Sequence, residues 1–286
     1  MIIFGHSLDK AKTFLRKTRI WANRYGGEEE LQNIRRGRRE QCWCGGKLHP
    51  FHWHPNYGVC VECGCYVNRC PPLREEYQKI YSWESYWHRR QEMKGFPAIE
   101  FRAHHDRSDG RLDRWLKVIE QYGPGKGRVI EIGCGHGVLL AALQEKGYEC
   151  IGVEIDEAVA EWTKKKTGVK VVAGFFPDID LPKCDLFIAL DVIEHSPSPD
   201  AFMSTAAALL KGNGIAMIQT PTDHHHSQPP FREVFANVFD DLEHLYVFTP
   251  ESIHKLGEFA GLKIIAEATG IREQDITVYR VNSCSV

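Results

Sequence analysis

The feature that most constrains the fold is an alternation, from Gly127 onward, of short apolar runs with stretches whose apolar residues have helical spacing. The expected strands are 128–132, 149–153, 169–172, 186–190, 215–219, 262–267 and 276–281, and the expected helices are 138–146, 157–166, 199–210 and 250–260. This alternation is typical of βαβ units. It predicts an α/β fold with a doubly wound, mostly parallel sheet and an antiparallel edge near the end of the chain.

Length and composition limit the remaining possibilities. The 286 residues allow one large domain with a small module. A formal net charge of −2 gives no global reason to expect a polyanionic partner. Because no apolar stretch approaches 18 residues and no export signal is visible, we expect no membrane span and a cytoplasmic location. The oligomeric state is left open.

The cysteines are concentrated near the N-terminus. Of the ten in the chain, six lie between Cys42 and Cys70. In a reducing compartment such a cluster favours metal binding over disulfides. The pattern contains a C-x-C pair and a C-x-x-C-G knuckle, which predicts a structural zinc site. The expected ligands are Cys42, Cys44, Cys60 and Cys63, with Cys65, Cys70, His49, His52 and His54 in reserve.

These patterns divide the chain into four parts. Residues 1–40 form a basic helical arm, 41–72 the zinc-binding module, 73–122 a helical connector and 123–286 the α/β domain. The arm contains an Arg-Arg-Gly-Arg-Arg run, 35–39, that is suited to RNA or to another anionic partner. A solvated helical extension is the simpler interpretation.

A glycine-rich turn follows the first expected strand of the α/β domain. It reads Glu-Ile-Gly-Cys-Gly-His-Gly over 131–137 and leads directly into a helix. Glycines at such a turn bring the backbone close to a nucleotide-type ligand. The third glycine comes one residue too early for the dinucleotide fingerprint, which disfavours NAD. Glu154 ends the second strand, 21 residues after Gly133, where a carboxylate binds a ribose diol.

Together these motifs resemble class I S-adenosylmethionine-dependent methyltransferases. The resemblance is carried by the glycine turn, Gly152-Val153-Glu154, the Asp-Val-Ile-Glu-His run at 191–195 and the Glu-His…Phe-Thr-Pro-Glu segment at 243–251. It implies a seven-stranded Rossmann-like sheet. One branch, which includes sugar C-methyltransferases, also begins with a small zinc module followed by motifs similar to 68–72 and 81–87.

The resemblance assigns roles to residues. The expected cofactor-binding residues are Glu131, Gly133, Gly135, Gly137, Glu154, Asp191 and Val192, with Phe175 or Phe176 against the adenine. His244 is the first candidate for general base, beside Glu243 for a substrate hydroxyl, and His195 is the second. Tyr81 and Tyr86 are the candidate lid over the acceptor, although an aromatic stripe is as often part of a core.

The predicted function is transfer of a methyl group from S-adenosylmethionine to a small polar acceptor, such as a sugar, nucleotide-sugar or secondary metabolite. The alternative is an rRNA or tRNA methyltransferase that grips RNA with its zinc ribbon and basic arm. A ribbon with few basic residues argues against RNA. An intact glycine turn and Glu154 argue against a non-catalytic scaffold.

Overall fold

The computed structural model describes residues 33–51, 54–223, 238–268 and 274–282. They belong to two units. The first, which we call the cysteine unit, is drawn from Met1–Tyr77 and Asp223–Ser252. The second, the sheet unit, is drawn from Gln78–Thr222 and Ile253–Val286. The segment Asp223–Ser252 thus belongs to the N-terminal unit, although the sequence pattern places it in the α/β domain 123–286.

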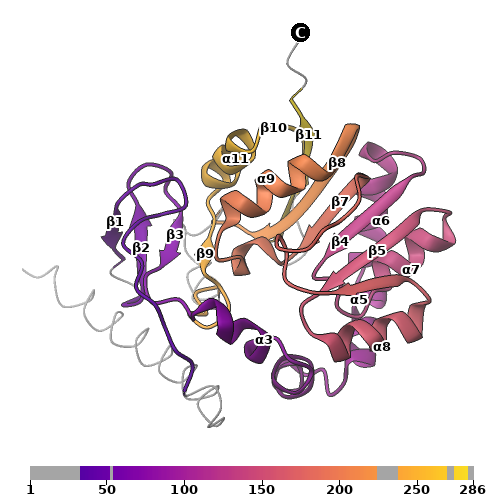
Figure 1. Ribbon diagram of the computed structural model, residues 1–286, viewed down its shortest axis with the longest axis horizontal. Helices are drawn as coiled ribbons and strands as arrows, with labels where there is room; N and C mark the ends of the chain where they lie inside the picture. The colour runs from indigo at the N-terminus through magenta and orange to yellow at the C-terminus, as the bar shows by residue number, and fades with distance from the viewer. Residues whose placement is uncertain (1–32, 52–53, 224–237, 269–273, 283–286) are drawn as a thin grey trace, which may run out of the picture. The chain divides into compact units, whose positions relative to one another are not determined.

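The sheet unit contains a seven-stranded sheet in the order β10-β11-β8-β7-β4-β5-β6 (Figure 1). Its strands are β4 (Arg128–Ile132), β5 (Glu149–Glu154), β6 (Lys170–Ala173), β7 (Cys184–Leu190), β8 (Leu210–Pro221), β10 (Leu262–Ala268) and β11 (Gln274–Val281). Five neighbouring strands pair in parallel, in the order β8, β7, β4, β5 and β6. Strand β11 is antiparallel to both β8 and β10. The predicted parallel sheet with an antiparallel edge is confirmed.

Helices cover both faces of this sheet, as the side chains of β7 show. The helices are α5 (Ile99–Ser108), α6 (Arg111–Tyr122), α7 (Val138–Glu145), α8 (Glu157–Thr167), α9 (Pro199–Leu209) and α11 (Pro250–Phe259). Leu186 and Ile188 join the core cluster that includes residues of α6 and α7. Phe187, between them, packs against Phe202 of α9. Because strand side chains alternate between faces, α9 covers the face opposite to α6 and α7.

The order of the strands reverses between β4 and β7. From β4 the chain proceeds outward through β5 and β6, and β7 then returns to pair with the other side of β4. Ligands of open α/β sheets bind beyond the carboxyl ends of the strands at such a reversal. The turn after β4 and the residues after β7 therefore mark the place to look for a site.

Short helical segments precede α5. They are η1 (Arg74–Glu76), α3 (Tyr77–Ile80), the π-helical η2 (Trp83–Arg90) and α4 (Gln91–Met93). The hydroxyl of Ser82 accepts a hydrogen bond from the Ser85 backbone N–H, which starts η2. Wide π-helical turns of this kind are rare and frequently occur at functional sites. Within the described ranges, no helix has the length and hydrophobicity needed to cross a bilayer.

The cysteine unit has a four-stranded antiparallel sheet in the order β1-β2-β3-β9. Its strands are β1 (Leu48–Pro50), β2 (Tyr57–Cys60), β3 (Tyr66–Asn68) and β9 (Tyr246–Val247). The first three follow one another along the chain, whereas β9 comes from the segment between β8 and α11. Most of the predicted basic arm, residues 1–32, lies outside the described residues.

Candidate functional site

The turn after β4 needs glycine at each position of its motif. Gly133, Gly135 and Gly137 have φ values of 68°, 47° and 69°, in the left-handed region that other residues rarely adopt. A Cβ on Gly133 would lie 2.6 Å from the Val192 side chain, and one on Gly135 would lie 2.7 Å from the Trp87 ring. The glycines thus let Val192, the second residue after β7, and Trp87 of η2 approach the turn closely.

Two buried carboxylates lie beneath this turn. Glu154, which is 6% exposed, accepts hydrogen bonds from the backbone N–H groups of Gly135 at 3.0 Å and Ile155 at 2.9 Å. Burial raises the pKa of Glu154 to about 7 even though these hydrogen bonds lower it.

Glu131 is 5% exposed, and its Oε2 is buried with no hydrogen-bond partner. Burial, with a contribution from the charge on Glu154, raises its pKa to about 8. Both positions therefore suit a ligand that donates hydrogen bonds.

Asp191 directly follows β7 and has an unusual backbone conformation. Its φ of 55° makes it a left-handed residue other than glycine. Its backbone N–H donates to the Gln219 carbonyl at 2.9 Å, and the Gln219 amide donates to its Oδ1 at 3.1 Å. The Trp115 indole donates in turn to Gln219 Oε1 at 2.8 Å. This chain of hydrogen bonds fixes Asp191 beside the glycine turn, since Val192 follows it and contacts Gly133.

The two phenylalanines after β6 differ in their surroundings. Phe176 is 5% exposed and packs edge-to-face on Phe202, with ring centroids 4.7 Å apart, as well as against Phe187. It is therefore a core residue on the α9 face of the sheet. Phe175 is only half-buried. Of the two candidates for adenine contact, Phe175 is the one with an accessible ring.

His195 and Tyr81 come together in the sheet unit. His195 lies in the short 3-10 helix η3 (Ile193–His195) after β7, and its Nδ1 is 3.1 Å from the Tyr81 hydroxyl. The Tyr86 ring lies beside Tyr81, with a centroid distance of 5.6 Å. An imidazole and two phenols thus lie together near the segment that follows β7, which also contains Asp191.

The glycine turn is supported by an interaction that no sequence pattern indicates. His136, within the turn, donates from Nε2 to Asp106 of α5 at 3.0 Å, and its Nδ1 is 3.4 Å from the Val138 backbone N–H at the start of α7. Asp106 is 3% exposed and also accepts from the Arg102 Nε at 3.0 and 3.1 Å. Arg111 lies 3.5 Å away. Nothing in the spacing of these charged residues distinguishes them from a solvated helix face.

The electrostatics of this group support one protonation state. Burial alone would raise the pKa of Asp106, but the hydrogen bond from His136 and the charges of Arg102 and Arg111 outweigh it and hold the pKa well below its ordinary value. Burial lowers the pKa of His136. The pair is therefore a charged carboxylate and a neutral imidazole, which braces the glycine turn against α5.

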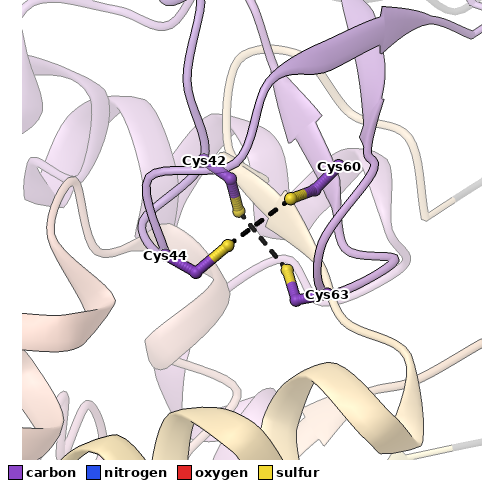
Figure 2. A group of neighbouring side chains, drawn as sticks. All are labelled: Cys42, Cys44, Cys60 and Cys63. Carbon is purple, nitrogen blue, oxygen red and sulfur yellow. Dashed lines mark hydrogen bonds between the residues drawn. The ribbon is translucent and has the colours of Figure 1, made fainter.

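In the cysteine unit the four predicted ligands converge (Figure 2). The Cys42 and Cys63 sulfurs are 3.6 Å apart, those of Cys44 and Cys60 are 3.5 Å apart, and all four lie within 4.8 Å of one another. Every cysteine in the described ranges is a free thiol. The arrangement is a compact cluster of four sulfurs that comes from two turns.

The reserve candidates lie outside this cluster. Cys65 is fully buried, and its thiol donates to the Val247 carbonyl at 3.4 Å. His54 is 7% exposed and packs against the Tyr57 ring. Neither Cys70 nor His49 belongs to the four-sulfur group, and His52 lies outside the described residues.

Glu243 and His244 belong to the cysteine unit, in the loop before β9. The Nδ1 atom of His244 donates to the Val238 carbonyl at 2.5 Å. In the neutral imidazole this places the lone pair on Nε2, the atom that can take a proton. Glu243 is 4% exposed.

The arginines of the Arg-Arg-Gly-Arg-Arg run contact their own unit. Arg35 pairs with Glu76 at 2.7 Å, Arg36 donates to the Cys70 carbonyl at 3.0 Å, Arg38 pairs with Glu40 at 3.1 Å and the Arg39 guanidinium lies 4.9 Å from the Tyr246 ring centroid. The backbone of this run also bonds to residues 69–73. These contacts give the run a structural role in the cysteine unit.

Comparisons with known proteins identify relatives over more than half of the chain. A family described as "Methyltransferase domain" matches residues 102–267. The chain is 28% identical over 132 residues to the ubiquinone biosynthesis O-methyltransferase of Bordetella avium (strain 197N), a match that covers 43% of this chain and 54% of that protein. The protein of the same name from Coxiella burnetii (strain Dugway 5J108-111) is 27% identical over 173 residues, with 57% and 71% covered. The chain thus spans about half of the Bordetella protein.

Solved structures share the fold. An S-adenosylmethionine-dependent methyltransferase from Clostridium acetobutylicum ATCC 824 superimposes with a TM-score of 0.52 at 12% identity, covering 64% of this chain and 98% of that one. The mitomycin 7-O-methyltransferase MmcR gives a TM-score of 0.51 at 16% identity, with 64% and 57% covered. At these identities the likeness is one of fold.

Proposed function

We propose that this chain, which belongs to the methyltransferase-domain family, transfers a methyl group from S-adenosylmethionine to a hydroxyl group or activated carbon of a small polar molecule such as a sugar, nucleotide-sugar or secondary metabolite. Two relatives are named ubiquinone biosynthesis O-methyltransferase. Because their name describes methylation of oxygen, it favours a hydroxyl acceptor for this chain as well. The observation that carries the proposal is the pair of buried carboxylates, Glu131 and Glu154, beneath the glycine turn.

The donor set fits the cofactor. S-adenosylmethionine presents an ammonium group and a ribose diol, both hydrogen-bond donors, and supplies a methyl group activated by its sulfonium. Glu131 has a buried oxygen without a donor, and Glu154 ends β5, the usual position of the ribose-binding acid. We assign the ammonium group to Glu131 and the ribose diol to Glu154, with the three glycines beneath the cofactor. Asp191 and Val192 are assigned to its methionine end, and Phe175 to the adenine.

The chain must then orient the acceptor and take its proton. His244 is our first candidate for the base, because its Nδ1 donates to the Val238 carbonyl and this fixes the neutral tautomer that has its basic nitrogen at Nε2. Glu243 would orient the acceptor hydroxyl. His195, held by Tyr81, is the second candidate, with Tyr81 and Tyr86 against the acceptor.

We also propose that Cys42, Cys44, Cys60 and Cys63 hold a zinc ion. Four thiolates about 2.3 Å from a tetrahedral zinc lie about 3.8 Å from one another. The sulfur separations of 3.5 and 3.6 Å fit this geometry. A zinc with four protein thiolates has no open position for a substrate, so its role is structural.

The contacts of the run 35–39 only partly weaken the RNA alternative. Arg36 and Arg39 make contacts within the cysteine unit, whereas the side chains of Arg35 and Arg38 are 63% and 76% exposed in their ion pairs. A small acceptor is favoured instead by the names of the relatives and by the few basic residues of 41–72.

Calorimetric titration with S-adenosylhomocysteine tests the cofactor site. Replacing Glu154 with Ala should weaken binding by at least about 10-fold, because charge-assisted hydrogen bonds are lost. Glu149→Ala is the matched control, since Glu149 is an exposed acid on the same strand. Equal affinity for all three proteins would reject the assignment of Glu154.

Transfer of labelled methyl to a panel of sugars, nucleotide-sugars and phenols then tests the acceptor class. With an accepted substrate, His244→Ala should keep its affinity for S-adenosylhomocysteine but lose roughly 100-fold or more in turnover. If only His195→Ala shows this loss, the base is His195. Methylation of RNA alone would reject a small acceptor.

A further inference from the structure

The segment 238–248 carries the proposed base and is built into the sheet of the cysteine unit. Its strand β9 pairs with β3, with Tyr246 opposite Val67 and Val247 opposite Tyr66. The Asn68 backbone N–H also donates to the Leu245 carbonyl at 2.9 Å. A two-residue strand contributes few backbone hydrogen bonds, so side chains must supply most of the hold on this segment.

Aromatic packing supplies the first part of that hold. Phe239 is 5% exposed, and its ring centroid lies 4.9 Å from that of Tyr57, 5.0 Å from Phe51 and 5.4 Å from Tyr66. Tyr57, Phe239 and Val247 form the buried centre of this cluster. Phe239 of the segment 238–248 is thus enclosed by aromatic rings from β2, from β3 and from the residue that follows β1.

Hydrogen bonds to backbone carbonyls supply the second part. Tyr57 has no exposed surface, and its hydroxyl is 2.5 Å from the His244 carbonyl and 3.2 Å from that of Asp240. Both acceptors belong to the loop with Glu243, in which the His244 N–H donates to the Asp240 carbonyl at 2.8 Å. A single phenol therefore closes the turn that presents His244.

Asp241 is held from three directions. Its side chain accepts from the Asn56 amide at 2.5 Å, and its carbonyl accepts from the Asn68 amide at 2.8 Å and from Arg36 at 2.9 Å. Asn56 directly precedes β2, whose first residue is Tyr57 and whose last is the metal-site residue Cys60. Strand β2 therefore connects the four-sulfur cluster, at Cys60, with Asn56 and Tyr57, whose side chains hold the loop 240–244.

From this arrangement we propose that the four-cysteine module is a positioning element for Glu243 and His244, with Tyr57 as the positioning residue that connects the metal-bound strand to their loop. The inference rests on the function proposed above for His244. It gives the metal a role in acceptor-side chemistry without contact with the substrate: metal binding orders β2, β2 places Tyr57, and Tyr57 holds the loop.

The first test is Tyr57→Phe in the full chain, which removes one hydroxyl and keeps the ring. We expect amide hydrogen exchange in 238–248 to accelerate by about 10-fold and turnover to fall by a similar factor, the scale of one hydrogen bond. Zinc content and affinity for S-adenosylhomocysteine should stay within about twofold of wild type. Tyr77→Phe is the matched control, because Tyr77 is a buried tyrosine of the same unit whose hydroxyl donates to the Pro72 carbonyl.

The second test removes the metal from the full chain with a chelator. Exchange in 238–248 should accelerate and be restored by added Zn²⁺, while affinity for S-adenosylhomocysteine is retained. Unchanged exchange in 238–248 after both Tyr57→Phe and metal removal would overturn the proposal. Faster exchange in an enzyme whose His244→Ala variant keeps its turnover would instead reject His244 as base, so the two failures are distinguishable.

Discussion

The two units reach an ordered site by different physical means. In the sheet unit, residues from the seven strands and from helices α6 and α7 form one apolar core cluster, which includes the completely buried side chains of Val129, Leu186 and Ile188. In the cysteine unit the buried cluster around Tyr57 is small, and four sulfurs converge beside a sheet of short strands. Modules of this size usually need a metal or disulfides because they cannot bury enough apolar surface. From this comparison we expect the sheet unit to bind the cofactor whether or not zinc is present. We expect the cysteine unit to be ordered only when zinc is bound.

The largest expected effect comes from breaking the metal site. Cys60→Ser should abolish stoichiometric zinc binding and unfold the cysteine unit, since structural zinc contributes about 10–16 kcal/mol of binding energy coupled to folding. Hydrogen exchange over 42–68 should lose its protection, while calorimetry should give an affinity for S-adenosylhomocysteine within about twofold of wild type.

Cys70→Ser serves as the control, because this thiol is half-buried and lies outside the four-sulfur group. A Cys60→Ser protein that keeps both zinc and exchange protection would show that the module folds on its aromatic cluster alone. A large loss of cofactor affinity would show that the two units are not independent.

The sequence predicts the sheet unit closely, and the reasons are local. Apolar runs such as 128–132 and 186–190 match β4 and β7 because buried parallel strands need unbroken hydrophobic stretches. The glycine turn and Glu154 are recognisable because their positions are fixed by backbone conformation and by the strand end. The four cysteines proposed as metal ligands lie within 4.8 Å of one another, since the members of each pair are close in the sequence.

The contacts that the sequence does not reveal are non-local or ambiguous. Strand β9 has two residues, and no pattern indicates that it pairs with β3; its loop reaches Tyr57 from 187 residues away. Asp106 and Arg102 look like an exposed ion pair on a helix, and only the fold shows that His136 buries the carboxylate. Phe175 and Phe176 are adjacent, and only packing reveals that Phe176 belongs to the core.

A smaller effect should come from Asp106→Asn in the sheet unit. Asn can still accept a hydrogen bond from His136, but Arg102 and Arg111 lose their shared counter-charge in a buried position. Breaking such a group costs about 3 kcal/mol or more, so chemical denaturation at pH 7 should show a clear loss of stability, and the braced glycine turn should bind S-adenosylhomocysteine more weakly. Zinc content should not change.

The pH dependence of this loss has a definite sign. The pKa of Asp106 is held below its ordinary value, so its contribution is present at neutral pH and disappears as the pH falls below about 4 toward the folded-state pKa. The stability difference between wild type and Asp106→Asn should therefore shrink in acid. The exposed helix residue Asp113, replaced by Asn, is the control. Equal stability of the two variants at pH 7 would mean that the arginines find other partners.

The smallest effect is expected from Glu131→Gln, and it should separate stability from binding within the sheet unit. The pKa of Glu131 is raised to about 8 from an ordinary value of 4.5, so the folded protein binds more protons than the unfolded chain between these limits. Wild type therefore loses stability as the pH rises from 5 to 8, whereas a neutral amide does not. The variant should melt at least about 2 °C above wild type at pH 8, the shift that 1 kcal/mol produces in a chain of this size, and the advantage should vanish by pH 5.

The affinity of Glu131→Gln for S-adenosylhomocysteine should fall, because an amide binds an ammonium group less strongly than a carboxylate does. A variant that gains stability at pH 8 and keeps full affinity would remove Glu131 from the cofactor site and leave Glu154 as its buried acid.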